Sequence, residues 1–170
     1  ATGTVLHVSR STDSGVTWTE ILTVTNGLNP ALAVTSAGTA GCLYQQLVGT
    51  RWETHLRRRT NTGTTWTDLI LSNTPDNNPA PLFQFYLRDY CDLMSVRNKF
   101  YGVFSASNIP DSANFPQGVK YQRNANFTTH QLRNLANTGN VNTSIDPFFF
   151  AVEQRNILDR CLIMPWRCKV

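Results

Sequence analysis

The sequence predicts an all-β chain, folded as a partial β-propeller of about three four-stranded antiparallel blades. Three observations predict this fold class. Residues that favour strands (Val, Thr, Phe, Tyr and Trp) are plentiful. Several segments alternate apolar and polar residues, which is the period of a half-buried strand. The phrase Ser-Thr-Asp-Ser-Gly-Val-Thr-Trp at 11–18 returns 48 residues later as Arg-Thr-Asn-Thr-Gly-Thr-Thr-Trp at 59–66, and one four-stranded blade runs roughly 40–50 residues.

The composition limits the class of protein and of partner. The chain has 170 residues, which is typical of one domain, and its 41% hydrophobic and 15% charged residues indicate a globular protein. A formal net charge of +4 permits weak attraction to acidic partners. The basic run Arg57-Arg58-Arg59 would alternate between two faces of a strand, which argues against nucleic acid. The absence of an apolar run of ~18 residues argues against a membrane span.

The first predicted element is a hairpin. Val5–Ser9 alternates before the first phrase and Trp18–Val24 alternates after it, so the phrase forms the turn between two strands. This opening half-blade, residues 1–28, supplies only the outer pair of strands.

Two further sets of strands follow. Residues 29–74 predict a complete blade with strands Ala31–Thr35, Cys42–Val48, Glu53–Thr60 and Thr65–Leu71. Residues 75–136 predict a third set with strands Cys91–Val96, Phe100–Ser105, Val119–Arg123 and His130–Leu135. Residues 145–152 supply a closing strand, Asp146–Val152, and residues 153–170 form a C-terminal extension without a clear period.

The number of blades is too small for a closed ring. Closed propellers usually have four to eight blades, whereas this chain supplies two and a half to three. Open sheet edges promote aggregation. We therefore expect the ring to be completed by a homo-oligomer or by blades that lie outside these residues.

Each residue type in the repeated phrase suits a tight turn. Gly15 and Gly63 suit a positive φ, and Asp13 can accept hydrogen bonds from its own turn, as Asn61 can through its amide oxygen. The following β-branched and aromatic residues suit the outgoing strand and packing between blades. The residues with a predicted structural role are Ser11, Asp13, Gly15, Thr17, Trp18, Asn61, Gly63, Thr65 and Trp66.

The phrase resembles the Asp-box, or BNR repeat, S-x-D-x-G-x-T-W, of sialidases and other Asp-box propellers. The first copy matches at every defined position, and the second departs at Arg59 and Asn61. Residues 85–93 also look like the F-x-x-G-D-Y-x-G-L segment of secreted bacterial sialidase-like propellers, with Arg88 and Asp92 in place of the two glycines. The resemblance implies half of a six-bladed propeller, the C-terminal half of such a protein.

The resemblance also implies where a ligand would bind. In propellers of this kind the box turns lie on one face and ligands typically bind on the other. Arginine can grip a carboxylate through two parallel hydrogen bonds, and tyrosine can stack on a sugar ring. The candidate ligand-binding residues on that second face are Arg51, Arg88, Asp89, Tyr90, Asn108 and Asp111.

The chemistry of sialidases is only partly represented. The resemblance implies an arginine triad, a Tyr nucleophile assisted by a Glu, and an Asp acid/base, an exception to the two-carboxylate scheme. The early Arg-Ile-Pro motif is missing, because Asn108-Ile109-Pro110 lacks the arginine, and neither Glu53 nor Glu153 has an obvious Tyr partner. No catalytic residue is assigned.

The sequence is therefore compatible with three functions. The first is a non-catalytic sialidase-like module that binds a glycan, such as an anionic sugar, or a protein. The second is a fragment of an exo-sialidase whose catalytic residues lie partly outside this chain. The third is a structural propeller that oligomerises through open edges. No cofactor is expected, and a surface rich in Asn, Thr and Ser is common in secreted proteins, with the periplasm as an alternative location.

The four cysteines allow three pairings. Cys161–Cys168 is expected to close a C-terminal loop, and Cys42–Cys91 to join neighbouring blades, with free buried thiols as the alternative. No CxxC spacing exists and the three histidines are scattered, so no metal site is expected.

Overall fold

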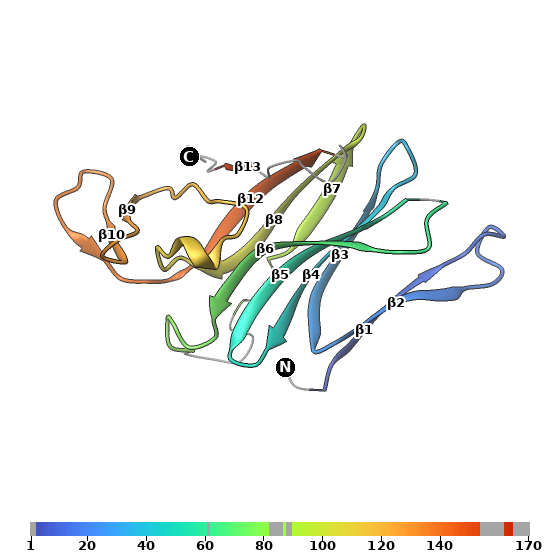
Figure 1. Cartoon of the computed structure of the whole chain (residues 1–170), viewed down its shortest axis with the longest axis horizontal. Coiled ribbons are helices and arrows are strands. Elements are labelled where there is room, and N and C mark those ends of the chain that lie inside the picture. The colour runs from blue at the N-terminus through green and yellow to red at the C-terminus, as the bar shows by residue number, and fades with distance from the viewer. Residues whose placement is uncertain (1–2, 61, 82–86, 88–89, 154–161, 165–170) are drawn as a thin grey trace.

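The computed structural model describes residues 3–60, 62–81, 87, 90–153 and 162–164. Strands in antiparallel sheets make up its regular structure, apart from one short 3-10 helix, so the all-β prediction is confirmed (Figure 1). The described strands form separate sheets and do not close into a ring.

The first two strands form the predicted hairpin. They are β1 (Val5–Arg10) and β2 (Thr19–Thr25), paired antiparallel with a bulge between Val8 and Ser9. In β1 the apolar residues Leu6 and Val8 are buried while their neighbours are exposed. The hairpin therefore has one apolar face, as its alternation predicts.

The second sheet is a four-stranded meander in the order β3-β4-β5-β6. Its strands are β3 (Gly27–Val34), β4 (Ala40–Val48), β5 (Arg51–Arg59) and β6 (Thr67–Pro75). The four predicted strands of residues 29–74 are all present, and the second phrase lies between the third and fourth of them. Both faces of β4 are buried. The buried residues are Gly41, Cys42, Leu43, Tyr44 and Gln45.

The third sheet differs from the prediction. Its order is β13-β12-β8-β7, with strands β7 (Asp92–Val96), β8 (Lys99–Ser107), β12 (Ile145–Glu153) and β13 (Leu162–Met164). The expected strand Val119–Arg123 does not form, and β8 pairs along its length with β12 instead. The predicted closing strand is thus the central partner of β8, and part of the C-terminal extension adds an edge strand.

The segment between β8 and β12 is an insertion that carries its own small sheet. It holds the 3-10 helix η1 (Ser112–Asn114) and a three-stranded sheet of β9 (Asn124–Asn126), β10 (Gln131–Arg133) and β11 (Asn140–Val141). Figure 1 shows this segment beside one end of the two larger sheets. The predicted strand His130–Leu135 therefore exists as β10 but belongs to a separate sheet.

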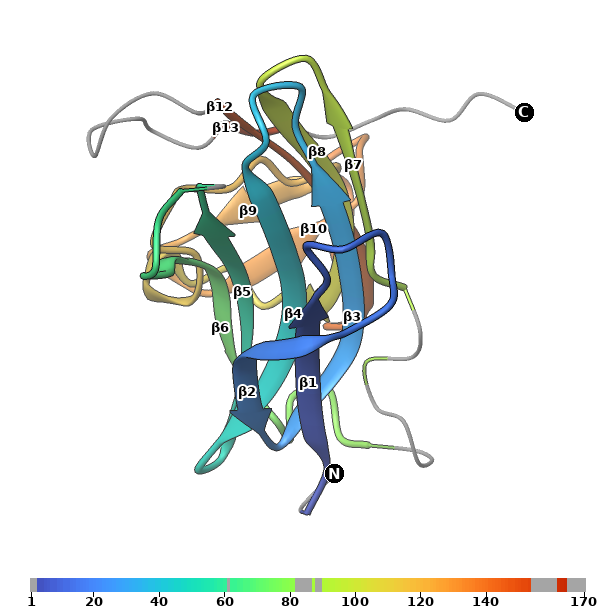
Figure 2. The same ribbon diagram turned by 90° about the vertical axis from the view of Figure 1, so that its right-hand side faces the viewer.

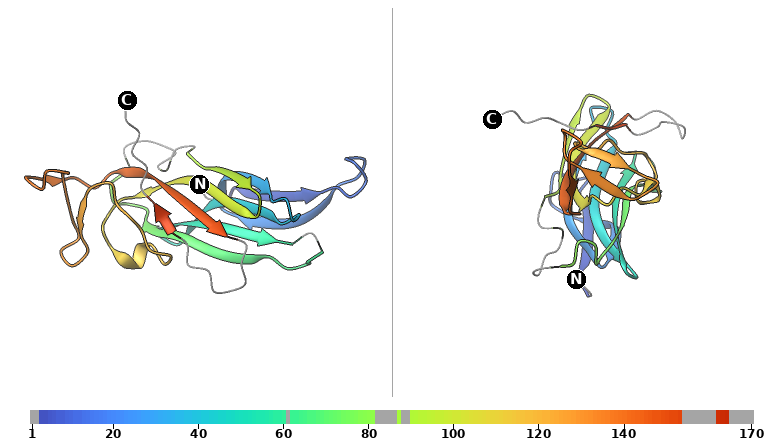
Figure 3. Two further views of the ribbon diagram at one scale, coloured as in Figure 1. Left: turned by 90° about the horizontal axis from the view of Figure 1, so that it is seen from above. Right: turned by 90° about the vertical axis from the view of Figure 1, so that its left-hand side faces the viewer.

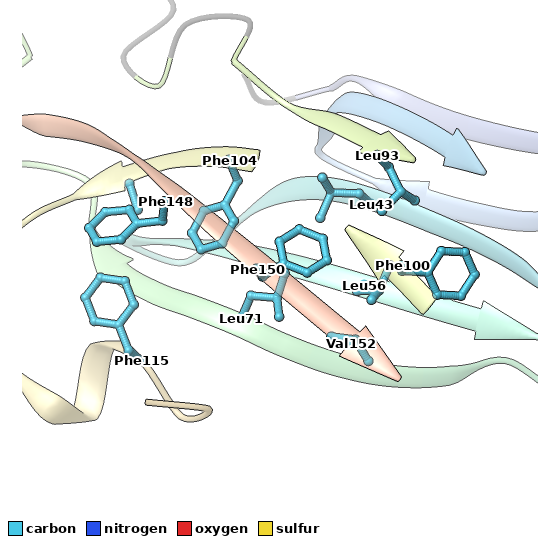
Figure 4. Close-up of a cluster of buried hydrophobic side chains, with 11 residues drawn as sticks. Leu43, Leu56, Leu71, Leu93, Phe100, Phe104, Phe115, Phe148, Phe150 and Val152 are labelled. Carbon is cyan, nitrogen blue, oxygen red and sulfur yellow. The ribbon is translucent and has the colours of Figure 1, made fainter. Parts of the chain in front are cut away.

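The main core lies between the two four-stranded sheets. Phe104, Phe148 and Phe150 from β8 and β12 point toward leucines of the other sheet, including Leu43 and Leu71 (Figure 4). Gly41 keeps this contact close, because a Cβ there would lie 2.6 Å from the Phe100 ring. Burial of these large side chains is the main stabilising contribution, at about 25 cal/mol per Å².

A second, smaller core lies under the hairpin, on the opposite face of the β3-β4-β5-β6 sheet. Leu6, Val8, Leu22 and Val24 of the hairpin pack against Cys42 and Tyr44 of β4. The hairpin and the two sheets thus form successive layers. In the view from above, the hairpin (blue) and the insertion between β8 and β12 (orange) lie at opposite ends of the molecule (Figure 3). We call the face of the middle sheet toward β1 and β2 the hairpin face, and the face toward β8 and β12 the inner face.

Candidate functional site

The first phrase forms a turn closed by its own side chains. The Asp13 carboxylate accepts hydrogen bonds from the Thr17 hydroxyl at 2.5 Å, the Thr17 backbone N–H at 2.9 Å and the Ser11 hydroxyl at 2.8 Å. The Ser11 oxygen in turn accepts from the Gly15 N–H at 2.8 Å. Gly15 has φ +91°, so its predicted positive φ is confirmed.

These hydrogen bonds change the acidity of Asp13. Donation by the Thr17 hydroxyl, with that from the Thr17 N–H and from Ser11, lowers the pKa of Asp13 to about 2. Such a carboxylate is ionised at neutral pH and holds no proton to donate. Asp13 stabilises its own turn, as the sequence predicts.

The second turn is built differently. Gly63 donates its N–H to the Thr60 carbonyl and accepts from Arg59 Nε at 2.8 Å. Gly63 does not have a positive φ, so that expectation was wrong; a Cβ there would instead lie 2.5 Å from the Thr60 hydroxyl oxygen. Thr65 is exposed, and Asn61 lies outside the described residues.

The two tryptophans of the phrases have different surroundings. Trp66 packs against the core under the hairpin and donates Nε1–H to the Ile21 carbonyl at 2.8 Å. Trp18 is 65% exposed and donates to the Gly15 carbonyl within its own turn. Trp66 therefore packs between the hairpin and the middle sheet. Trp18 has no sheet layer over it in the described chain, so the predicted packing role does not hold for it.

The end of the sheets opposite the two turns holds two of the sequence-predicted ligand residues, Arg51 and Asp111. Arg51 begins β5 and donates to the side chain and carbonyl of Asn73 and, at 2.6 Å, to Asn114 Oδ1. Asp111 caps η1 by accepting from the Ala113 N–H at 2.9 Å. Both are brought near one another through η1, but both side chains already bind protein groups.

The remaining candidates do not complete a site. Asn108 is fully buried, and its amide bonds to Ser144 and to Asp146 at 2.7 Å. An amide enclosed and satisfied in this way is not available to a ligand, so its predicted role is not supported by its position. Tyr90 is 57% exposed. Arg88 and Asp89 lie outside the described residues.

Sequence reasoning missed a charged cluster on the hairpin face of β5 and β6. The buried His55 ring has Nε2 3.0 Å from Glu53 and Nδ1 3.0 Å from Asp68, and Tyr44 stacks on it at 5.0 Å between centroids. Burial raises the pKa of Asp68, but hydrogen bonding and charge from His55, with Arg57, outweigh it and hold this pKa below its usual value. The i, i+2, i+4 spacing of Glu53, His55 and Arg57 on one strand face was the signal that could have revealed it.

This cluster does not provide the tyrosine nucleophile of a sialidase. Burial raises the pKa of Tyr44, whose hydroxyl has no hydrogen-bond partner within the described chain. A nucleophilic phenol needs an adjacent base that takes its proton. The carboxylates of Glu53 and Asp68 instead bind the ring of His55.

An apolar opening lies between the hairpin and β3. We call this opening the hairpin groove, and its volume is about 320 Å³. Residues of β1 form its wall, residues of β3 form its floor, and residues of the two repeated phrases lie at one end. Its main lining residues are Val8, Ser9, Arg10, Ser11, Trp18, Leu32, Ala33, Val34, Arg59 and Thr60. Leu32 and Val34 are 57% and 62% exposed, and none of the described lining residues is acidic. The sequence predicts strand β3 but not the exposure of Leu32 and Val34 on its hairpin face. Figure 2 shows the turn of the β1-β2 hairpin in front of β3.

The predicted Cys42–Cys91 disulfide is absent, and both thiols are free. The two cysteines lie on opposite sides of the middle sheet, because Cys42 packs under the hairpin whereas Cys91 packs against the inner core. Burial raises their pKa values to about 11 and about 12 respectively, so both thiols stay protonated and unreactive at neutral pH. Cys161 and Cys168 lie outside the described residues.

The described residues hold no group of three or more His, Cys, Asp or Glu side chains arranged to bind a metal ion. Among them there is also no helix with the length and apolarity needed to cross a membrane. Comparison with known proteins gives no match to any family model, to any curated protein or to any solved structure.

Proposed function

We propose that this chain is a non-catalytic binding module of the Asp-box propeller type, and that it binds a polypeptide partner in the hairpin groove. The observation that carries the proposal is the groove itself. Leu32 and Val34 are more than half exposed at its floor, beside the exposed indole of Trp18. Exposed apolar side chains gathered at one concave surface are typical of an interaction site.

The arrangement of strands supports a propeller-type module. The middle sheet is a four-stranded meander whose third and fourth strands flank the second phrase. The hairpin β1-β2 flanks the first phrase in the same way and packs face to face on that sheet. Repetition of one supersecondary unit in stacked layers is the pattern of propeller blades.

The chemistry of the groove favours a polypeptide over a glycan. Sugars are held by several polar groups with precise hydrogen bonds, in addition to an aromatic platform. Trp18 supplies an aromatic platform, and Arg10 and Arg59 supply hydrogen-bond donors. The groove floor, however, offers only aliphatic side chains. A partner with its own apolar side chains would bury that floor.

The test is to probe the folded chain with an array of peptides and an array of glycans. Leu32→Asp places a charge on the groove floor and should weaken binding at least tenfold, which corresponds to about 1.4 kcal/mol. Val96→Asp, at a similarly exposed apolar residue of β7, is the matched control and should bind as the parent does. Binding that survives Leu32→Asp, or two blank arrays with folded protein, would refute the proposal.

A second candidate is a fragment of an exo-sialidase with an anionic-sugar site at the other end of the sheets. The guanidinium of Arg51 favours it, because it gathers with Asn114 and Asp111 there. Turnover of a fluorogenic sialoside by the chain, lost in Arg51→Ala, would support this function. A folded chain without turnover leaves the binding module as the proposal.

A further inference from the structure

We propose that the hairpin groove accepts an extended strand of a partner polypeptide, which hydrogen-bonds antiparallel to the free edge of β1 and carries carboxylates in its first residues. This inference rests on the proposed function and adds the conformation, direction and charge of the bound partner.

The outer edge of β1 presents unpaired backbone groups. The hairpin is a two-stranded sheet, and in the described chain no strand other than β2 pairs with β1. The Asn26 N–H donates to the Thr4 carbonyl at 2.6 Å, so Thr4 directs its carbonyl toward β2. Backbone groups alternate in direction along a strand, and those of Val5 and His7 therefore point away from β2.

The repeat shows what belongs beside that edge. The second phrase joins β5 to β6, and β5 pairs on its other side with β4, antiparallel from Ala40 to Val48. The first phrase joins β1 to β2 in the same way. By this equivalence the vacant position next to β1 suits a strand that runs antiparallel to it. A strand added to an open edge gains main-chain hydrogen bonds without sequence specificity.

The groove floor is shaped for alternate side chains of such a strand. Leu32 and Val34 lie two residues apart on β3, on the hairpin face. An added strand places every second side chain on that face at the same spacing. Its apolar side chains would then cover the floor, just as Leu6 and Val8 cover Cys42 and Tyr44.

The charge of the groove sets the direction of the partner. Arg10 ends β1, and Arg59, whose Nε donates to the Gly63 carbonyl, ends β5. Both line the groove near the two phrases, where no described lining residue is acidic. A strand antiparallel to β1 begins at this end. Carboxylates in its first residues would meet these arginines, and opposite charges across an interface steer and orient association.

A second copy of this chain does not fit the same position. Its β1 would bring along its own middle sheet, which is packed under its hairpin through Leu6 and Val8. That sheet would occupy the space above Leu32 and Val34 of the first copy, where β1 and β3 already line one groove. The groove has room for a strand without a second layer beneath it.

The test measures by fluorescence anisotropy how the full chain binds a labelled peptide of about eight residues. The peptide begins with Asp-Asp and continues with alternating Thr and Val. His7→Pro removes an N–H that points away from β2, which an edge strand tolerates. We expect it to weaken peptide binding about tenfold, while His7→Ala binds as the parent does. A peptide with Lys-Lys in place of Asp-Asp should bind more weakly by a similar factor.

The outcomes separate this inference from the proposed function. If His7→Pro and His7→Ala bind the peptide equally, the partner does not pair as a strand with β1. If the Asp-Asp and Lys-Lys peptides bind equally, the proposed charge polarity is wrong. In either case, loss of binding in Leu32→Asp keeps the groove as the binding site. If His7→Pro does not fold, peptides N-methylated at alternate amides replace it, and one of the two methylation patterns should abolish binding. Binding by both patterns overturns the inference. If an array ligand requires Leu32 but the peptide does not bind, the inference fails and the function stands.

Discussion

At the scale of single residues, the first phrase shows how far residue chemistry can be predicted. Asp13 was expected to bond within its own turn, and its carboxylate accepts from Thr17 and Ser11 there. Short-range hydrogen bonds depend on a few neighbouring residues and are therefore accessible to sequence reasoning. The exposure of Trp18 was not predictable in this way, since it depends on which distant strands cover the turn.

The lowered pKa of Asp13 predicts a pH dependence of stability. The folded pKa is about 2 and the ordinary value is 3.8, so the ionised carboxylate favours the folded state above pH 4, and this contribution is lost as pH falls through 2. Thermal unfolding of the parent and of Asp13→Asn should differ most at neutral pH and converge toward pH 2. A difference that stays constant across this range would show that the carboxylate charge has no part in the turn.

At the scale of the elements, strands were predictable but their partners were not. Short runs of strand-favouring residues located β1, β2, β4, β5 and β8 to within a few residues, because at least one face of each packs on a core. The pairing of β8 with β12 spans the whole insertion. No local pattern marks such a contact, so the predicted third set joined strands that were merely consecutive in sequence.

The inner face of β4 holds a buried polar link between the two large sheets. The Gln45 side chain donates to the Ser105 carbonyl of β8 at 2.7 Å and accepts from Asn29 at 2.8 Å, with no exposed surface. Gln45→Ala should lower the free energy of unfolding by about 1–3 kcal/mol, because it leaves buried polar groups unpaired. Gln46→Ala, whose side chain lies near the surface, is the control and should cost less than half as much in urea unfolding. Equal losses would contradict the link.

At the scale of the whole molecule, the layers differ in how strongly they are held. The two four-stranded sheets share the large core with Phe100, Phe104 and Phe150, whereas the hairpin is a two-stranded layer on a smaller core. Isolated two-stranded sheets are marginally stable in water. The proposed binding edge therefore belongs to the layer expected to open most readily, as binding elements commonly do.

The two tryptophans of the repeated phrases provide a test of this order. Trp66 holds the hairpin to β6 through packing and its bond to the Ile21 carbonyl, whereas the indole N–H of Trp18 donates to Gly15 within its own turn. In hydrogen exchange, Trp66→Phe should accelerate exchange of β1 and β2 amides at least tenfold and leave β8 and β12 unchanged, because local opening needs no global unfolding. Trp18→Phe is the matched control and should leave β2 close to the parent. If Trp66→Phe accelerates exchange equally in β8 and β12, the hairpin does not open as a separate layer and the molecule unfolds as one unit.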